Sequence, residues 1–201
     1  MINLNVHRLS SDVKMPTYGT SMSACFDLCF CPTLGSVTGY DKHNQPIYRT
    51  LLPDNGIYLN PGDRLLIPTG LVMKVRKHVS VETFADITRE EDELHQFSIR
   101  LHARSGMALK RGLVLANAEG IVDVDYQEEV FILMHNISET NQIISYNERI
   151  AQGEVIVNEK VNIIEVIERP KKYSERDGGF GSTGTQSPEK KTFDSSILDE
   201  I

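Results

Sequence analysis

Short apolar stretches recur along most of the chain, and turns rich in Gly, Pro, Asn and Asp separate them. Ile2 to Val6 alternates apolar and polar residues, which is typical of a half-buried strand. Gly70 to Val75 forms another such run, and Val161 to Ile167, which Pro170 ends, is the last strong one. No segment has the periodicity of a helix longer than one or two turns. The pattern therefore predicts an all-β fold, a sandwich or a barrel of many short strands.

Two stretches interrupt this series of strands. Residues 32–55 are rich in turn-forming residues and predict a long surface excursion that contains an extra hairpin from Pro46 to Leu52. Residues 76–97 contain an acidic run, which predicts a solvated loop or a short surface helix. Both stretches look like insertions into an otherwise regular β domain.

The apolar pattern ends at Lys171. We therefore expect one β-rich domain over residues 1–169 and a flexible C-terminal arm over residues 170–201. Within the arm, Gly178 to Gly184 is too rich in glycine to hold structure by itself. One interpretation is a flap whose Phe180 stacks on a planar base while amides and hydroxyls bind phosphate oxygens. The other is a disordered tail with an accidental composition.

Charge narrows the possible functions. The 201-residue chain has a formal net charge of −7, which argues against non-specific nucleic-acid binding, because that requires a basic surface. An anionic substrate would need local cations, backbone donors or a metal ion. The chain has no run of about 18 apolar residues, so no membrane span is expected. Met1 to Ser10 also lacks the apolar core of a signal peptide.

The three cysteines are Cys25, Cys29 and Cys31. Their number is odd, their spacing fits no zinc motif, and no histidine near them in the sequence completes one. We expect them to be thiols in a reducing compartment, which predicts a cytoplasmic protein.

The segment from Gly120 to Tyr126 carries two carboxylates, Asp123 and Asp125, the second of them directly before the tyrosine. Apolar runs precede and follow the segment, so a hairpin or a tight connection between strands is predicted. In an extended segment the two carboxylates would point the same way, unless a turn intervenes. Taken alone, such a pair is most often two solvated turn residues.

Two further polar sites interrupt apolar sequence. Asp27 lies between Phe26 and Leu28 and is either a buried structural acid or an acid of a functional site. Arg104-Ser105-Gly106 ends a strand and enters a short helix-prone run. There the guanidinium, the hydroxyl and the first helical amides can bind an anion. The alternative is a Ser N-cap beside a surface arginine.

Taken in order, these segments resemble the five motifs of the trimeric deoxyuridine triphosphate nucleotidohydrolases, the dUTPases. Each motif alone is weakly specific, whereas five in the same order are highly specific. The resemblance covers residues 1–184 apart from the two insertions. The segments are Ala24-Cys25-Phe26-Asp27-Leu28, Ala103-Arg104-Ser105-Gly106-Met107-Ala108, Gly120 to Tyr126, Asn147-Glu148-Arg149-Ile150-Ala151-Gln152, and Arg176 to Gly184.

The resemblance implies a jelly-roll-like β fold and a homotrimer whose three active sites each draw on more than one subunit. It implies hydrolysis of dUTP to dUMP and pyrophosphate, with Mg²⁺ chelated by the triphosphate. Asp123 would be the general base for the water that attacks the α-phosphorus. Tyr126 would pack under the deoxyribose and exclude a ribose 2′-hydroxyl.

The same resemblance assigns the remaining contacts. Asn117 would lie in the uracil-binding hairpin, where backbone groups read the edge of the base. Asp27 would be linked to the magnesium site through structure or water, not as a direct ligand. The other substrate-binding residues would be Arg104, Ser105, Gly106 and Gln152 around the phosphates, Gly120 in the third motif, Phe180 with Gly181 over the uracil, and Arg176, Ser182 and Thr183 at the γ-phosphate.

Three positions depart from the family pattern. Cys25 stands where the family usually has glycine, so the backbone there must do without glycine's freedom. Only one residue separates Arg176 from the paired glycines that follow, where the family usually has two, which puts the role of Arg176 in question. Gln127-Glu128-Glu129 replaces the more usual Arg/Gln-Gly-Glu/Gln, a change that can alter the hairpin without touching Asp123.

Two other functions stay open on the sequence alone. A deoxycytidine triphosphate deaminase of related fold would need a general base at the cytosine amino group, for which that family uses a glutamate, whereas the position here falls on Asp123. A dUTPase-fold regulator would bind a protein partner through residues 32–55 and 76–97. The expected substrate is a nucleotide, and no nucleic-acid or membrane partner is expected.

Overall fold

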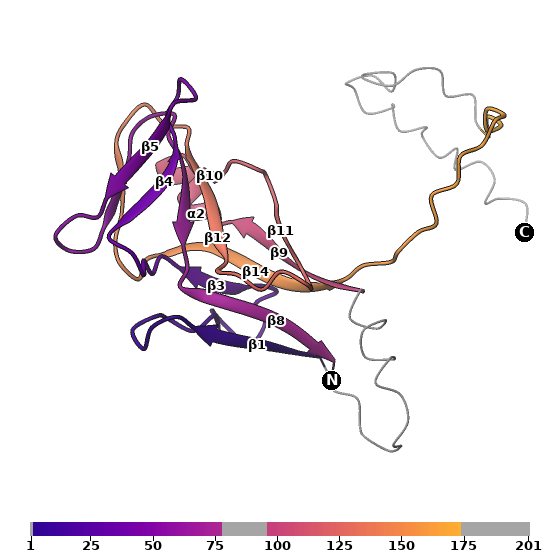
Figure 1. Ribbon diagram of the computed structural model, residues 1–201, viewed down its shortest axis with the longest axis horizontal. Coiled ribbons are helices and arrows are strands. Elements are labelled where there is room, and N and C mark those ends of the chain that lie inside the picture. The colour runs from indigo at the N-terminus through magenta and orange to yellow at the C-terminus, as the bar shows by residue number, and fades with distance from the viewer. Residues whose placement is uncertain (1, 78–95, 174–201) are drawn as a thin grey trace, which may run out of the picture. The chain divides into compact units, whose positions relative to one another are not determined.

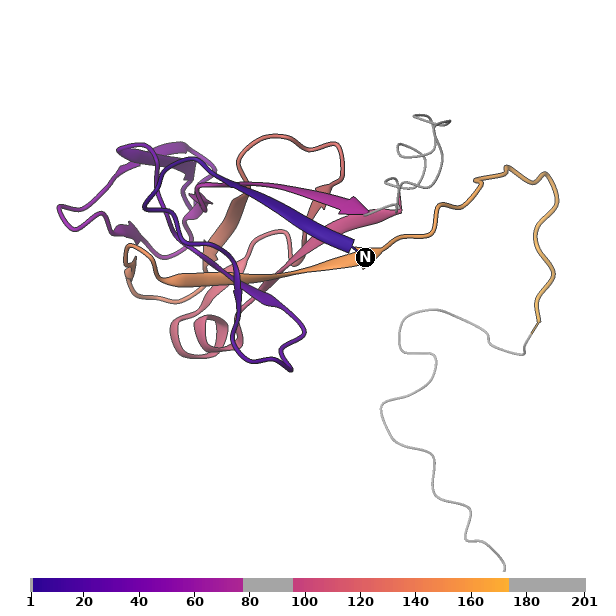
Figure 2. The ribbon, with the colours of Figure 1, turned by 90° about the horizontal axis from the view of Figure 1, so that it is seen from below.

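The computed structural model describes residues 2–77 and 96–173, and regular structure within these ranges is almost entirely β. Neighbouring strands pair antiparallel throughout. Figures 1 and 2 show the strands from two directions. The expected all-β, jelly-roll-like class is confirmed.

Two five-stranded sheets and two strand pairs make up the fold. The hairpin sheet has the order β10 (Leu113–Leu115), β12 (Phe131–Asn136), β7 (Arg64–Pro68), β4 (Ser36–Tyr40) and β5 (Pro46–Thr50). The site sheet has the order β11 (Gly120–Asp123), β9 (Phe97–Ala103), β14 (Arg149–Val157), β3 (Phe26–Cys29) and β2 (Thr17–Tyr18). The pairs are β1 (Ile2–Arg8) with β8 (Leu71–Lys77), and β6 (Ile57–Leu59) with β13 (Gln142–Ile144).

Alternating side chains of both sheets form one core. On β9, Phe97, Ile99 and Leu101 are buried, because residues two apart on a strand face the same way. Arg100, which lies between Ile99 and Leu101, and His102, which follows Leu101, are less buried and face the other side of the site sheet. The largest fully buried side chains are Leu28, Phe30, Ile57, Leu59, Leu65, Ile67, Leu71, Met73, Ile99, Leu113, Ile132 and Met134.

The hairpin predicted within residues 32–55 is present as β4 and β5, which extend the hairpin sheet beyond β7. Gly39 allows the close approach of β4 to β7, since a Cβ there would lie 2.0 Å from the carbonyl oxygen of Arg64. Arg49 of β5 donates to the buried carboxylate of Asp63, with Nη2 and Oδ2 2.7 Å apart. The insertion is therefore tied into the core.

A single short helix, α2 (Ser105–Arg111), is found in the described part of the chain. It ends at Gly112, whose φ of 63° lets its N–H reach the carbonyls of Met107 and Ala108. The expectation of no helix beyond two turns holds there. No helix among the described residues has the length and apolarity needed to cross a membrane.

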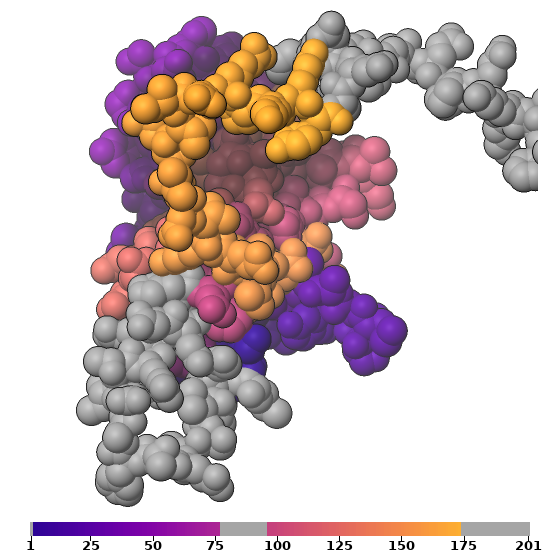
Figure 3. Space-filling model, turned by 90° about the vertical axis from the view of Figure 1, so that its right-hand side faces the viewer, coloured from indigo at the N-terminus to yellow at the C-terminus, as the bar shows by residue number. Residues whose placement is uncertain are grey.

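The strand predicted for Val161 to Ile167 is wrong. The last strand is β14, and residues 161–167 follow it without regular structure. Ile163 is 95% exposed and Ile167 is fully exposed. Figure 3 draws this irregular segment in gold. The apolar pattern is that of a strand, but the described part of the chain supplies no neighbour to pair with it.

The contacts within the chain divide it into Met1–Lys160 and Val161–Ile201. The boundary at residue 169 stays a prediction. Residues 78–95 and 174–201 lie outside the described residues, so the prediction for the acidic run within 76–97 and those for Arg176, Phe180, Gly181, Ser182 and Thr183 fall there.

Candidate functional site

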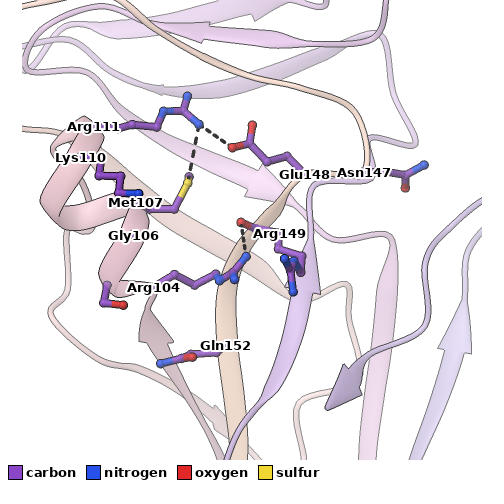
Figure 4. A pocket seen from close by; sticks show the side chains of 10 residues that line it. Arg104, Gly106, Met107, Lys110, Arg111, Asn147, Glu148, Arg149 and Gln152 are labelled. Atoms are coloured by element: carbon purple, nitrogen blue, oxygen red, sulfur yellow. Dashed lines mark hydrogen bonds and ion pairs between the residues drawn. The ribbon is translucent and has the colours of Figure 1, made fainter. Parts of the chain in front are cut away.

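A pocket of about 560 Å³ opens between the start of α2 and the first part of β14. Its volume is within the range of small-molecule sites. Figure 4 shows its side chains, which come from the second and fourth sequence motifs and from the end of α2. The lining residues are Arg104, Ser105, Gly106, Met107, Lys110, Arg111, Asn147, Glu148, Arg149 and Gln152. We call this the phosphate pocket, since four of these ten side chains are Arg or Lys.

One carboxylate holds two of the arginines. Asp27 forms an ion pair with Arg104, with Oδ1 and Nε 3.3 Å apart, and it accepts a hydrogen bond from Arg149, with Oδ2 and Nη1 3.0 Å apart. Arg104 also donates to the carbonyl oxygen of Arg149 at 3.1 Å (Figure 4). The Asp27 side chain is only 13% exposed. Asp27 is thus both a largely buried structural acid and an acid of the site, the two roles that the sequence left open.

The start of α2 presents two more of the expected residues. Arg104 is the N-cap, with an extended backbone and no capping bond from its side chain, so Ser105 is the first helical residue and not the cap. Ser105 and Gly106 are both exposed. A Cβ on Gly106 would meet nothing within 4 Å. The chain itself therefore leaves the space in front of Gly106 open.

Arg111 fixes the other end of α2. Its guanidinium donates to the carboxylate of Glu148, to the side-chain oxygen of Gln142 at 3.1 Å and to the backbone oxygen of Ile143. A contact with the sulfur of Met107 completes the set (Figure 4). These bonds hold the helix against the loop that precedes β14, so the two walls of the phosphate pocket keep their spacing.

Asp123 lies in a different hollow. It is the last residue of β11, and a turn follows in which the Tyr126 N–H donates to the Asp123 carbonyl at 3.1 Å. The turn places Asp125 outside the strand, so the alternative of an intervening turn is the one that the structure shows. A pocket of about 600 Å³ beside β9 has among its lining residues Asp123 and Asp125, with Arg100, Asn158 and Lys160.

Tyr126 is fixed by the residues that follow it. Its hydroxyl donates to the carbonyl oxygen of Glu129 at 2.8 Å, and the Glu129 carboxylate accepts from the Gly70 N–H at 2.7 Å. Burial raises the pKa of Tyr126, and Glu128 and Glu129 raise it further, so the hydroxyl stays protonated and can donate. Glu129, which matches the family pattern, thus anchors the turn, and the departure at Glu128 takes no part in these two bonds.

Asn117 lies on the connection between β10 and β11, which belong to different sheets. This segment is therefore a connection between sheets and not a hairpin. Its carbonyl accepts from the Glu119 N–H at 2.6 Å, and Ala118 has a φ of 60°. Gly120 begins β11, where a Cβ would lie 2.9 Å from that of Leu101, so a larger residue would push β11 from β9.

The expected residues therefore fall into separate groups. Arg104, Ser105, Gly106 and Gln152 line the phosphate pocket. Asp123 lines the second hollow, and the two hollows share no lining residue. Within residues 2–77 and 96–173, the cavity lined by Asp123 and the cavity lined by these phosphate ligands are therefore separate.

Sequence reasoning missed three cations of the phosphate pocket. Arg149 lies inside the fourth motif, but nothing local marks it as a site residue. A β-bulge between Arg149 and Ala151 shifts the register with β3 and lets Arg149 reach Asp27. Lys110 and Arg111 read as ordinary basic residues at a helix end.

Magnesium was expected near Asp27. Both carboxylate oxygens of Asp27 are engaged by arginines, and the phosphate pocket is dominated by cations. These residues fit a metal ion that arrives on a triphosphate, not one held directly by carboxylates. Asp27 could act on such an ion only through water or through Arg104 and Arg149.

Comparison with known proteins gives one family. The family model described as dUTPase matches residues 65–184. The chain is 30% identical over 177 residues to the deoxyuridine 5′-triphosphate nucleotidohydrolase of Caulobacter vibrioides, which covers 87% of this chain and 88% of the relative. It is 32% identical over 177 residues to that of Chlamydia trachomatis, covering 88% and 95%.

Solved structures share the fold. A mutant of the Staphylococcus bacteriophage 80alpha dUTPase with dUpNHpp superposes with a TM-score of 0.63 at 19% identity, over 91% of this chain and 99% of that one. Another structure of the 80alpha dUTPase gives a TM-score of 0.58 at 17% identity, over 84% and 99%. At these identities the likeness concerns the fold alone.

Replacing Arg111 tests the contact that spaces the pocket walls. We expect Arg111→Met to lower the free energy of unfolding by about 1–3 kcal/mol, because it leaves the Glu148 carboxylate and the Ile143 carbonyl without this donor. Lys110→Met is the matched control, since Lys110 is exposed on the same helix and its replacement removes the same charge. Urea unfolding of both variants measures the difference. Equal losses of unfolding free energy in the two variants would show that Arg111 contributes no more to stability than a surface charge does.

Proposed function

The chain belongs to the dUTPase family, and from that premise we propose that it is a dUTP diphosphatase, a hydrolase that cleaves dUTP to dUMP and pyrophosphate. The observation that carries this is the phosphate pocket, where Arg104, Lys110, Arg111 and Arg149 converge in a chain with a net charge of −7. A triphosphate needs such a local excess of cations to enter an acidic protein. The matched relatives are named for deoxyuridine 5′-triphosphate.

Arg104, Ser105 and Gln152 are the proposed phosphate ligands, with Gly106 leaving room for the chain of phosphates. Asp27 orients the guanidinium of Arg104 through the ion pair at Nε, and Nη1 donates to the Arg149 carbonyl, so the N–H groups of Nη2 remain for a ligand. We assign Arg149 to the same task, because it shares Asp27 and its side chain is 55% exposed. Such preorganised donors stabilise the charge that develops on transferred phosphoryl groups.

Asp123 is the proposed general base. Its side chain is exposed at the end of β11, and no hydrogen bond or ion pair with another described residue occupies its carboxylate. In the reaction, the water oxygen bonds to the α-phosphorus while the bond from that phosphorus to the bridging oxygen breaks. The carboxylate takes the proton of the water, and pyrophosphate leaves.

The nucleoside end of the substrate is assigned to the segment around Asp123. We propose that Tyr126 packs under the deoxyribose, where its ring leaves no space for a 2′-hydroxyl. The bond from its hydroxyl to Glu129 supports this role by fixing the ring. Asn117 and Gly120 flank the exposed connection whose backbone groups would read the uracil edge. Phe180 and Gly181 would cover the base, and Arg176, Ser182 and Thr183 would close on the γ-phosphate.

A homotrimer is the proposed assembly. Asp123 and the phosphate pocket line different hollows of one chain, so a site that needs both is completed between copies. The open space at Gly106 and the exposed apolar side chains within residues 161–167 support contact with a second copy.

Magnesium is the proposed metal. Bound to the triphosphate oxygens, it would offset negative charge on the leaving pyrophosphate. The protein's part would be to orient the phosphates through Arg104 and Gln152, with Asp27 acting through water or through its arginines. Three free cysteines, Cys25, Cys29 and Cys31, support a cytoplasmic location. A protein partner for residues 32–55 and 76–97 stays a prediction.

Replacing the base tests the mechanism. We expect Asp123→Asn to lower kcat by about two to four powers of ten, because the amide cannot take the proton. Asp125→Asn is the matched control, since Asp125 is two residues away, exposed and outside the strand. Steady-state pyrophosphate release measures both, with circular dichroism to check folding. Parent-like turnover in Asp123→Asn, or an equal loss in Asp125→Asn, would reject the assignment.

Mixing two inactive variants tests whether copies share a site. Asp123→Asn and Arg104→Gln each remove one half of the proposed site. If the halves come from different chains, co-expressing equal amounts should restore about one quarter of the parent rate, the fraction of sites that receive both intact residues in random assembly. A site within one chain would give no recovery.

A nucleotide panel tests the substrate. We expect pyrophosphate from dUTP, a rate on UTP about 100-fold lower because of the 2′-hydroxyl, and a loss of rate when a chelator removes magnesium. Ammonia release from dCTP would favour the deaminase alternative, for which a glutamate base is required. Comparable rates on dUTP and UTP would reject the role of Tyr126.

A further inference from the structure

Three metal-ligating side chains meet on the site sheet outside the lining of the phosphate pocket. Cys25, His102 and Glu154 each offer a ligand atom, and these atoms all lie within 4.8 Å of one another. No other such group of His, Cys, Asp and Glu occurs within residues 2–77 and 96–173. The cysteines match no zinc spacing along the chain, but the fold supplies the histidine that the sequence near them lacks.

The register of three strands brings the group together. His102 on β9 lies opposite Gln152 on β14, so Glu154 is its diagonal neighbour on the same face. On the other side of β14, Gly153 pairs with Phe26, and Cys25 is therefore the next residue in line with Glu154. All three side chains are partly buried. Ligands fixed by neighbouring strands need little rearrangement to bind an ion.

The spacing suits a small tetrahedral ion. His102 Nε2 and Glu154 Oε1 lie 3.0 Å apart. Nitrogen and oxygen ligands of a tetrahedral zinc ion lie about 3.3 Å apart, and a sulfur ligand lies about 3.6 Å from its neighbours, given the usual bond lengths. Small side-chain rotations would reach these values, so the three strands need not separate.

We propose that Cys25, His102 and Glu154 bind Zn²⁺, or a divalent transition ion of similar chemistry, with a fourth position open to water. One thiolate, one imidazole and one carboxylate are typical zinc ligands, whereas Mg²⁺ prefers oxygen alone. The site is distinct from the magnesium that is proposed to travel with the nucleotide.

Glu119 is placed to orient the histidine. One of its carboxylate oxygens is 3.8 Å from His102 Nδ1, and the other accepts from Arg100 at 3.0 Å. A carboxylate behind a zinc-bound histidine fixes the ring and raises its basicity. Burial raises the pKa of the Cys25 thiol, and the nearby Glu154 and Asp27 raise it further. The thiol is thus protonated without metal, and its proton leaves to solvent when the sulfur–zinc bond forms.

The ion would cross-link β9, β14 and the residue before β3. Gln152 and Asp27 lie two residues from Glu154 and Cys25 on the same face. Metal binding would therefore stiffen the part of the site sheet that carries the phosphate ligands, and it would stabilise the folded chain over the unfolded one.

Titration of the full-length protein with Zn²⁺ and with Co²⁺ tests the site. We expect one ion per chain, a higher unfolding temperature with Zn²⁺, and a thiolate-to-cobalt charge-transfer band with Co²⁺. Cys25→Ala should abolish the band, and it should weaken Zn²⁺ binding by more than about 100-fold, since loss of a ligand exceeds the usual effect of its supporting partner. Glu154→Gln should weaken Zn²⁺ binding while keeping the band, and Glu119→Gln should weaken it about tenfold.

Cys29→Ser is the matched control, because Cys29 ends the strand that follows Cys25 and is also partly buried but is outside the group. It should keep the band and the parent affinity. Binding without a thiolate band, a band that persists in Cys25→Ala, or an equal loss in Cys29→Ser would overturn the proposal. Because Cys25→Ala and Glu154→Gln change different ligands, one misfolded variant, detected by circular dichroism, does not remove the test.

Discussion

The antiparallel register of β9, β14 and β3 is the constraint on which the described part of the site depends. It places His102, Gln152 and Asp27 in one row across the site sheet, with Gln152 in the middle. A slip of one residue would turn every side chain of a strand to the opposite face. Buried neighbours such as Leu101 and Phe26 prevent this slip, because it would expose them to water. The hydrophobic core therefore sets the positions of the polar residues.

The same register also brings the Asp27 carboxylate next to two arginines. A largely buried carboxylate is costly unless it is paired, and here two arginines pair with it. Because Asp27 contacts each arginine through a single nitrogen, Arg104 and Arg149 keep donors for a ligand. The β-bulge after Arg149 makes this possible by directing its side chain to the same face as Asp27. A chain with a net negative charge thus concentrates cations at one place without leaving them unsupported.

The all-β class and most strand positions followed from apolar alternation, because that signal is local. The error at Val161 to Ile167 has the same origin: alternation reports the readiness of a segment to pair, not the presence of a neighbour. The turn after Asp123, the N-cap at Arg104 and the approach of His102 to Cys25 were not predictable, since each depends on backbone geometry or on contacts far apart in sequence. The five motifs supplied the expected residues, but only the fold places Arg104, Ser105, Gly106 and Gln152 in one hollow and Asp123 in another.

Three exposed features of the chain are consistent with contact between copies. Gly106 faces open space, Asp123 is exposed, and the apolar side chains within residues 161–167 are exposed as well. In an isolated chain each of these is unremarkable or unfavourable. If copies meet so that the β11 turn of one faces the phosphate pocket of another, the glycine provides room, the aspartate gains its phosphate neighbour and the apolar segment gains a partner. Cys25 also gains a role from residues far away in the sequence. Its backbone does not have a positive φ, so the position tolerates a side chain. That side chain completes a group with His102 and Glu154, which lie on two different strands.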